Sequence, residues 1–172
     1  MKYSSKSWLR RGAIASALAL AGAAAPAYAQ TGSDNLAVSA TVTENCVVTT
    51  SPVLFGNIDV TSNAVIENTG GISVTCTSGT AWAASANSGA SGTATLANRE
   101  MVNGVNKLSY ALYVDAGRST IWGDGVGETT GTFNGTGTGS AQASTVYARI
   151  PAGQTGLPAG AYSDTVVVTV TY

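Results

Sequence analysis

The sequence predicts an all-β fold, an antiparallel sandwich of short strands. Apolar side chains recur at every second residue in several short segments, which is typical of strands with one buried face. After residue 30 glycine, threonine, serine, alanine and valine are abundant and leucine is scarce, a composition that favours strands joined by tight turns. No convincing helix occurs in that part of the sequence, so we expect seven or so strands in a sandwich.

The first 29 residues have the features of a secretory signal peptide. Four basic residues among the first eleven precede an apolar run over residues 13–25, and an A-x-A sequence predicts cleavage between Ala29 and Gln30. A membrane anchor is the alternative, but the run is shorter than the roughly 20 residues that span a bilayer. No later segment is long and apolar enough to cross, so we expect an exported mature chain without a transmembrane segment.

Removal of this segment would leave an acidic chain of one domain. About 143 of the 172 residues remain, enough for a single core. Four basic residues then stand against nine acidic ones, a net charge of −5. Nucleic-acid binding needs clustered lysine and arginine. The sequence has no such cluster, so we exclude nucleic acid as a partner.

Two regular strands are expected near the ends of the mature chain, and neither has an obvious partner. Residues 36–42 alternate apolar and polar side chains, and so do residues 164–172. The apolar faces consist of Leu36, Val38, Ala40 and Val42 in the first, and Val166, Val168, Val170 and Tyr172 in the second.

Further strands are predicted between these two. Residues 123–140 hold seven glycines and few large apolar side chains, so we expect loops and short edge strands there. Gly70-Gly71 is expected to precede a strand whose Ile72, Val74 and Cys76 point inward. The strands are predicted at residues 46–50 (ended by Pro52), 72–77, 81–87, 108–114, from 120, 144–150 and 162–172.

The two cysteines, Cys46 and Cys76, permit one internal disulfide. Export makes their oxidation the expected state. Closure of that loop would stabilise the fold by about 3 to 4 kcal/mol in the chain-entropy model. A metal site is the weaker alternative, because two thiols without histidine make a poor zinc ligand set.

The sequence contains no histidine, which excludes the Ser-His-Asp and Cys-His nucleophile arrangements and most zinc, copper and iron sites. A glycosidase pair drawn from Asp115, Asp124 or Glu128 stays open, as does a calcium loop at residues 124–128, although its spacing is not that of an EF-hand. We favour turn positions for these carboxylates. Trp82 and Trp122 could line a sugar-binding platform, but we favour core positions. We therefore expect no enzyme activity, no cofactor and no metal site.

Several motifs, in order, resemble those of the spore coat protein U-like family, which includes the pilin subunits of archaic chaperone-usher pili. The resemblance covers essentially the whole mature chain. It rests on the signal peptide, the alternating strand at 36–42, Asn45-Cys46, Leu54-Phe55-Gly56, and the motifs at residues 72–77, 108–113, 121–125, 146–151 and 160–165.

This resemblance implies an incomplete immunoglobulin-like sandwich that lacks its final strand. A periplasmic chaperone would fill the open groove first, and the N-terminal strand of the next subunit would then replace it. Residues 30–44 would be the donor extension and residues 45–172 the pilin domain. Leu36, Val38, Ala40 and Val42 would be the donor side chains, and the strand with Val166, Val168, Val170 and Tyr172 one groove wall.

The expected function is that of a structural subunit of a surface pilus serving adhesion or biofilm formation. Its partners would be identical subunits, the chaperone, an outer-membrane usher and a tip adhesin, and its location would be the cell surface. Two alternatives stay open. One is a spore or cell-surface coat protein of the same family, and the other is a secreted carbohydrate-binding or hydrolytic sandwich.

Overall fold

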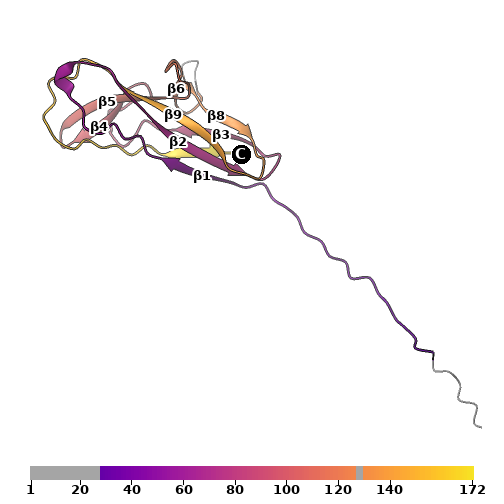
Figure 1. The fold of residues 1–172 in the computed structure, drawn as a ribbon. Coiled ribbons are helices and arrows are strands. Elements are labelled where there is room, and N and C mark those ends of the chain that lie inside the picture. Colours follow the sequence, from indigo (N-terminus) through magenta and orange to yellow (C-terminus); the bar gives the residue numbers. More distant parts are fainter. Residues whose placement is uncertain (1–27, 127–129) are drawn as a thin grey trace, which may run out of the picture. The chain divides into compact units, whose positions relative to one another are not determined.

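The computed structural model describes residues 28–126 and 130–172. Most of the expected signal peptide lies outside this part, and cleavage after Ala29 stays a prediction. The chain divides into two units, residues 1–39 and 40–172. In the first unit, residues 28–39 form no helix or strand. The second unit contains all of the described β-structure (Figure 1).

Ten strands and one short 3-10 helix occur in the described part of the chain. The helix η1 (Val60–Ser62) begins at Asp59, whose carboxylate accepts a hydrogen bond from the Thr61 amide. The strands are β1 (Cys46–Ser51), β2 (Ile66–Cys76), β3 (Ala81–Ala86), β4 (Arg99–Asn103), β5 (Asn106–Tyr113), β6 (Ile121–Trp122), β7 (Thr130–Gly131), β8 (Phe133–Thr136), β9 (Gln142–Ile150) and β10 (Val168–Thr171).

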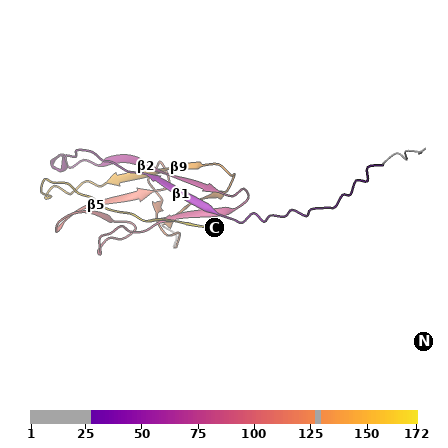
Figure 2. The same cartoon turned by 90° about the horizontal axis from the view of Figure 1, so that it is seen from below.

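The strands form two sheets, which confirms the predicted all-β sandwich. The larger sheet has the order β1-β2-β9-β5-β6-β7, with β4 paired to β5, and the smaller has the order β10-β3-β8. Figure 2 shows β1, β2, β9 and β5 side by side. Strands β6 and β7 are parallel, so the expectation of a wholly antiparallel arrangement was wrong there. Turn signals mark where a strand stops but not the direction of the next one.

The core lies between the two sheets and confirms the predicted inward faces. Ile72, Val74 and Cys76 of β2 are at most 3% exposed. Alternate residues of β3 and β5 are buried in the same cluster. The other buried members are Trp82, Ala84, Ala86, Leu108, Tyr110, Leu112, Trp122, Val146, Ala148 and Ile150.

Two internal strands differ from the prediction. β2 begins at Ile66, so Gly70 and Gly71 lie inside the strand and do not form a turn before it. A Cβ on Gly70 would lie 2.7 Å from Val53 Cγ2 and 2.9 Å from the Ser51 carbonyl oxygen, so this glycine permits a close approach of the chain that follows β1. β4 was not predicted at all, because its Arg99-Glu100 start breaks the apolar alternation.

Both end strands also differ from the prediction. Residues 36–42 belong to no strand, since within the described chain the segment has no ladder partner. The last strand is only β10, Val168–Thr171, so Val166 and Tyr172 lie outside it. Its partner β3 ends at Ala86, and upstream Ser163 pairs instead with Val102 at the end of the β4–β5 hairpin.

Candidate functional site

A groove of about 520 Å³ opens within residues 50–168. One wall is the end of β1 and the chain that follows it, from Thr50 to Phe55, and the other is the chain that leads into β10 and its first residue, from Tyr162 to Val168. Its floor is apolar and comes from the larger sheet, with Ile72, Met101, Leu112, Trp122 and Val146. This is a hollow with hydrophobic side chains at its base and main chain along both sides.

The two strands that flank the groove are both sheet edges. Among the described strands, β1 pairs only with β2, and β10 pairs only with β3. The Tyr172 hydroxyl donates to Asn45 Oδ1 at 3.5 Å, so the end of β10 lies close to the start of β1. Their facing edges therefore offer unpaired backbone groups where a further strand could pair.

Only two of the four predicted wall residues lie at the groove. Val166 and Val168 line the groove, and Val170 packs against the core beyond it. Tyr172 is 54% exposed and lies where β1 and β10 approach each other. Only the first part of the predicted strand thus borders the groove.

The predicted donor side chains are exposed in the two units that contain them. In residues 28–39 Leu36 is 89% and Val38 87% exposed, and in residues 40–172 Val42 is 82% exposed; Ala40 is also exposed. Isolated exposed apolar side chains are ordinary. An alternating series of them on a segment without secondary structure is not, because it presents a complete apolar strand face to water.

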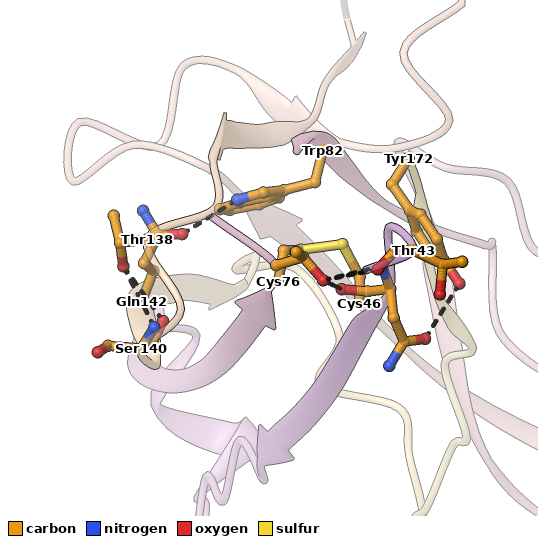
Figure 3. Close-up of a disulfide and its surroundings, with 10 residues drawn as sticks. Thr43, Cys46, Cys76, Trp82, Thr138, Ser140, Gln142 and Tyr172 are labelled. Atoms are coloured by element: carbon orange, nitrogen blue, oxygen red, sulfur yellow. Dashed lines mark hydrogen bonds between the residues drawn. A yellow bond between two sulfur atoms is a disulfide. The ribbon is translucent and has the colours of Figure 1, made fainter. Parts of the chain in front are cut away.

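The disulfide between Cys46 and Cys76 is present and joins directly opposed residues of β1 and β2. Hydrogen bonds beside it bind the chain that enters β1. The Thr77 amide donates to the Asn45 carbonyl at 3.0 Å, and the Thr77 hydroxyl donates to the Thr43 carbonyl at 3.3 Å. Figure 3 shows Thr43 and Tyr172 on the same side of this disulfide. The edge strand β1 is thereby held at the point where the extension begins.

The alternative chemical sites are not supported by the structure. The carboxylate of Asp115 accepts from the Ser119 and Thr120 amides, and these backbone hydrogen bonds, the one from Thr120 above all, lower its pKa. Asp124 binds the Val126 amide at 2.9 Å, whereas Glu128 lies outside the described residues. Across residues 28–126 and 130–172 no three His, Cys, Asp or Glu residues cluster as metal ligands would.

Trp82 and Trp122 do not form an exposed platform. Trp82 is 6% and Trp122 2% exposed. Their indole groups donate inward, to Gln142 Oε1 at 3.2 Å and to the Ala84 carbonyl at 3.0 Å respectively. A sugar ring could not stack on either face.

A polar network at one end of the groove was missed by sequence reasoning. Arg99 is fully buried, and its guanidinium donates to the carbonyls of Asn87, Leu96 and Trp122 at 3.0, 2.9 and 2.7 Å. Burial lowers the pKa of Arg99. A charged residue followed by Glu100 is usually read as solvent-exposed, so the sequence carries no signal for this role.

Tyr110 and Asp164 extend this network to the groove, where both line it. The Tyr110 hydroxyl donates to Asp164 Oδ2 at 2.6 Å. Burial raises the pKa of the phenol, and the adjacent carboxylate raises it further. The hydroxyl is therefore a neutral donor at all ordinary pH values.

No helix in the described ranges has the length and apolar character required to traverse a bilayer. The search of curated proteins returns no match. Among solved structures, a chain in the complex of CsuC and CsuE is similar, described as a chaperone-tip adhesion subunit pre-assembly complex from the archaic chaperone-usher Csu pili of Acinetobacter baumannii. The TM-score is 0.54 at 23% identity, and the match covers 77% of the present chain but only 40% of that chain.

This structural likeness supports the fold alone. The family comparison is more direct, because the Spore Coat Protein U domain matches residues 33–169, which include the groove, β1, the first half of β10 and most of the exposed extension. The chain therefore belongs to the Spore Coat Protein U domain family.

Proposed function

We propose that this protein is a structural subunit of a chaperone-usher surface pilus, and that it polymerises when residues 30–44 of one copy fill the groove of another. The observation that carries the proposal is the open groove between the unpaired edges of β1 and β10, together with an exposed segment whose apolar side chains alternate. Such an inserted strand would pair its backbone with both edges and place its apolar face on the groove floor.

The donor segment and the groove floor are both apolar. Residues 36–42 in a strand would extend over about 20 Å, and their apolar face has Leu36 and Val38 towards one end, Val42 at the other and the small Ala40 between. The floor is correspondingly apolar, with aliphatic and aromatic side chains. Unpaired edges of this kind are normally hidden, because they promote aggregation.

The donor segment and the groove are different surfaces of one chain, so the contact between copies is heterologous. Contacts of this type build open filaments instead of closed pairs. Before assembly a chaperone would occupy the groove, and an outer-membrane usher would receive the subunit. These partners, a possible tip adhesin, the cell-surface location and a role in adhesion or biofilm formation are part of the proposal.

Deletion of residues 30–43 tests this function. The truncated chain should remain a chaperone-bound monomer, whereas the mature chain should give a ladder of multimers that resist SDS and dissociate on heating. A ladder from the truncated chain would contradict the proposal.

A point variant gives a matched comparison. Val38→Asp should reduce polymerisation strongly, because a carboxylate would enter an apolar groove without a partner. Val105→Asp is the control, since Val105 is 91% exposed in the β4–β5 turn and outside the groove lining. Equal losses in both variants would argue against specific insertion of residues 36–42.

A protective coat protein is the second candidate, favoured by the description of the matching family. The same strand exchange would build a coat in place of a thin fibre. Electron microscopy of the cell surface separates the two, since a pilus appears as discrete filaments and a coat as a continuous layer.

A further inference from the structure

The groove wall at residues 163–168 passes from one sheet to the other. Ser163 exchanges two backbone hydrogen bonds with Val102 of β4, at 2.8 and 3.2 Å, whereas Val168 is paired with Ala86 of β3. The residues between them, 164–167, belong to no strand. This part of the wall therefore needs other partners to stay in place.

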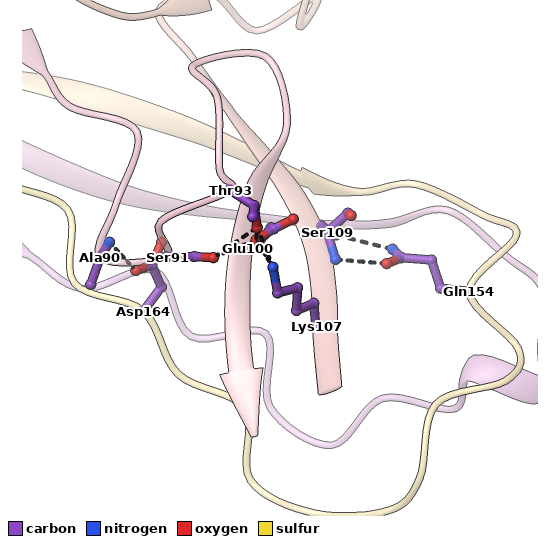
Figure 4. Close-up of polar contacts among 8 residues, drawn as sticks. All are labelled: Ala90, Ser91, Thr93, Glu100, Lys107, Ser109, Gln154 and Asp164. Atoms are coloured by element: carbon purple, nitrogen blue, oxygen red, sulfur yellow. Dashed lines mark hydrogen bonds and ion pairs between the residues drawn. The ribbon is translucent and has the colours of Figure 1, made fainter. Parts of the chain in front are cut away.

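Asp164 supplies one set of these partners. Its Oδ1 accepts from the Ala90 amide at 2.8 Å and from the Thr165 amide at 2.7 Å, and its Oδ2 accepts from the Tyr110 hydroxyl at 2.6 Å. Figure 4 shows the Asp164 carboxylate directed at Ala90. The carboxylate thus connects the wall to the 87–98 loop and to β5 of the larger sheet.

Asn87 supplies the other set. Its side-chain Oδ1 accepts from the Val167 backbone N–H at 2.9 Å, and its backbone N–H donates to the Val167 carbonyl at 3.1 Å. The backbone carbonyl of Asn87 accepts in turn from the guanidinium of buried Arg99 at 3.0 Å. Asn87 thereby continues the pairing of β10 by one residue past the end of β3, from a loop that Arg99 fixes.

The direction of the Val167 hydrogen bonds determines which backbone groups face the groove. Along an extended strand the backbone groups of successive residues point to opposite edges. Since Val167 is bonded on the β3 side, the N–H and C=O groups of Val166 and Val168 point to the open edge. Both residues also line the groove.

We infer that Asp164 and Asn87 act as a wall latch, by which we mean two positioning residues that keep residues 164–167 in register with β10. The strand edge that is open to an inserted strand then begins at Val166 and continues through β10. This inference rests on the proposed strand exchange. Without the latch, the open edge would be limited to β10, and much of the groove would lack a backbone partner on that side.

Capture of a fluorescent peptide of residues 30–44 tests the latch. Every chain in the test carries Val38→Asp, so that its own extension does not fill the grooves first, and the chain with this change alone is the wild-type reference. Asp164→Ala should lower the affinity for the peptide by at least about tenfold, the cost of losing one or two backbone hydrogen bonds. Asp164→Asn should restore most of it, because the amide oxygen can still accept from Ala90 and Thr165. Asp59→Ala is the matched control, since Asp59 bonds only within the η1 turn.

The outcomes separate the latch from the proposed function. If Asp164→Ala captures the peptide as well as the wild-type chain does, the latch is wrong while strand exchange stands. If the wild-type chain captures no peptide, strand exchange fails, and the latch with it. Loss of capture in Asp59→Ala equal to that in Asp164→Ala would also overturn the latch, because general destabilisation would then explain both.

A measurement on the wild-type chain covers the case in which Asp164→Ala does not fold. Hydrogen–deuterium exchange should show the Val166 amide becoming protected on peptide capture, together with that of Val168. If Asp164 only stabilised the fold, peptide capture would not need to protect the Val166 amide. Protection at Val168 without protection at Val166 would overturn the inference.

Discussion

Arg99 illustrates how single side chains organise this fold. None of its surface is exposed, and its guanidinium donates to three carbonyls, those of Asn87 and Leu96 in the loop before it and that of Trp122 after it. The residue therefore fixes the 87–98 loop to the strand that carries Trp122. Burial of a cation costs desolvation free energy. Its removal is also costly, because each of the carbonyls would be left without a hydrogen-bond donor.

Arg99→Leu should accordingly lower the free energy of unfolding by roughly 3 kcal/mol or more, since unpaired buried acceptors cost about 1–3 kcal/mol each. Urea denaturation of the mature chain followed by tryptophan fluorescence measures this change. Arg149→Leu is the control. Its guanidinium forms a partly exposed ion pair with Glu67 at 2.7 Å, and loss of such a pair changes stability by about 0–1 kcal/mol.

Glu100 gives a prediction for pH dependence. Its carboxylate accepts hydrogen bonds from the hydroxyls of Ser91 and Thr93 and pairs with Lys107 at 3.1 Å (Figure 4). The two hydroxyls, Ser91 first, lower its pKa from 4.5 to about 2. A lowered native pKa means that the stabilisation is complete above about pH 4.5 and is lost as the pH falls towards 2.

Glu100→Gln should therefore weaken the acid sensitivity of the fold. Between pH 4.5 and 2 the free energy of unfolding should fall less steeply in the variant than in the wild-type chain, because the unfolded wild-type Glu100 binds a proton that the native one does not. Parallel curves over this range would show that Glu100 does not contribute. Denaturation at several pH values provides the measurement.

At the scale of elements, the important contrast is between strands that are completed within the chain and strands that are not. β2, β9 and β5 each have neighbours on both sides, whereas β1 and β10 end their sheets. The disulfide fastens β1 to β2 at its first residue. An edge strand with a single partner gains most from such a link, because β2 alone supplies its backbone hydrogen bonds.

Replacement of both cysteines by serine should lower the free energy of unfolding by about 3 to 4 kcal/mol, the loop-closure value for this separation. The loss should be accompanied by faster amide exchange in β1 than in β9, which does not depend on the link. Uniform acceleration across both strands would indicate that the disulfide stabilises the whole domain and not the edge in particular.

At the scale of the whole molecule, the proposed assembly makes each subunit a donor at one place and an acceptor at another. The chain without residues 30–43 would accept a strand but have none to donate. When mixed in equal amounts with the mature chain, it should shorten the multimers, since each truncated copy ends the filament it joins. Gel ladders and electron microscopy would show this, and unchanged lengths would argue against a directional contact.

The sequence by itself determined the features that depend on local pattern. Alternation identified the buried faces of β2, β5 and β9, because a strand with one buried face has a period of two whatever its neighbours are. Two cysteines and an expected signal peptide were enough to predict the disulfide. The family resemblance supplied the expectation that residues 36–42 serve another copy, which stays a prediction.

Only the tertiary structure decided the features that depend on contacts between distant residues. The last strand was predicted too long because its true length is set by where β3 ends and by the pairing of Ser163 with Val102. Arg99 is buried because two carbonyls of the 87–98 loop and that of Trp122 converge on it. The groove lies between residues 50–55 and 162–168 because sheet pairing, which no local pattern encodes, leaves those two edges facing each other.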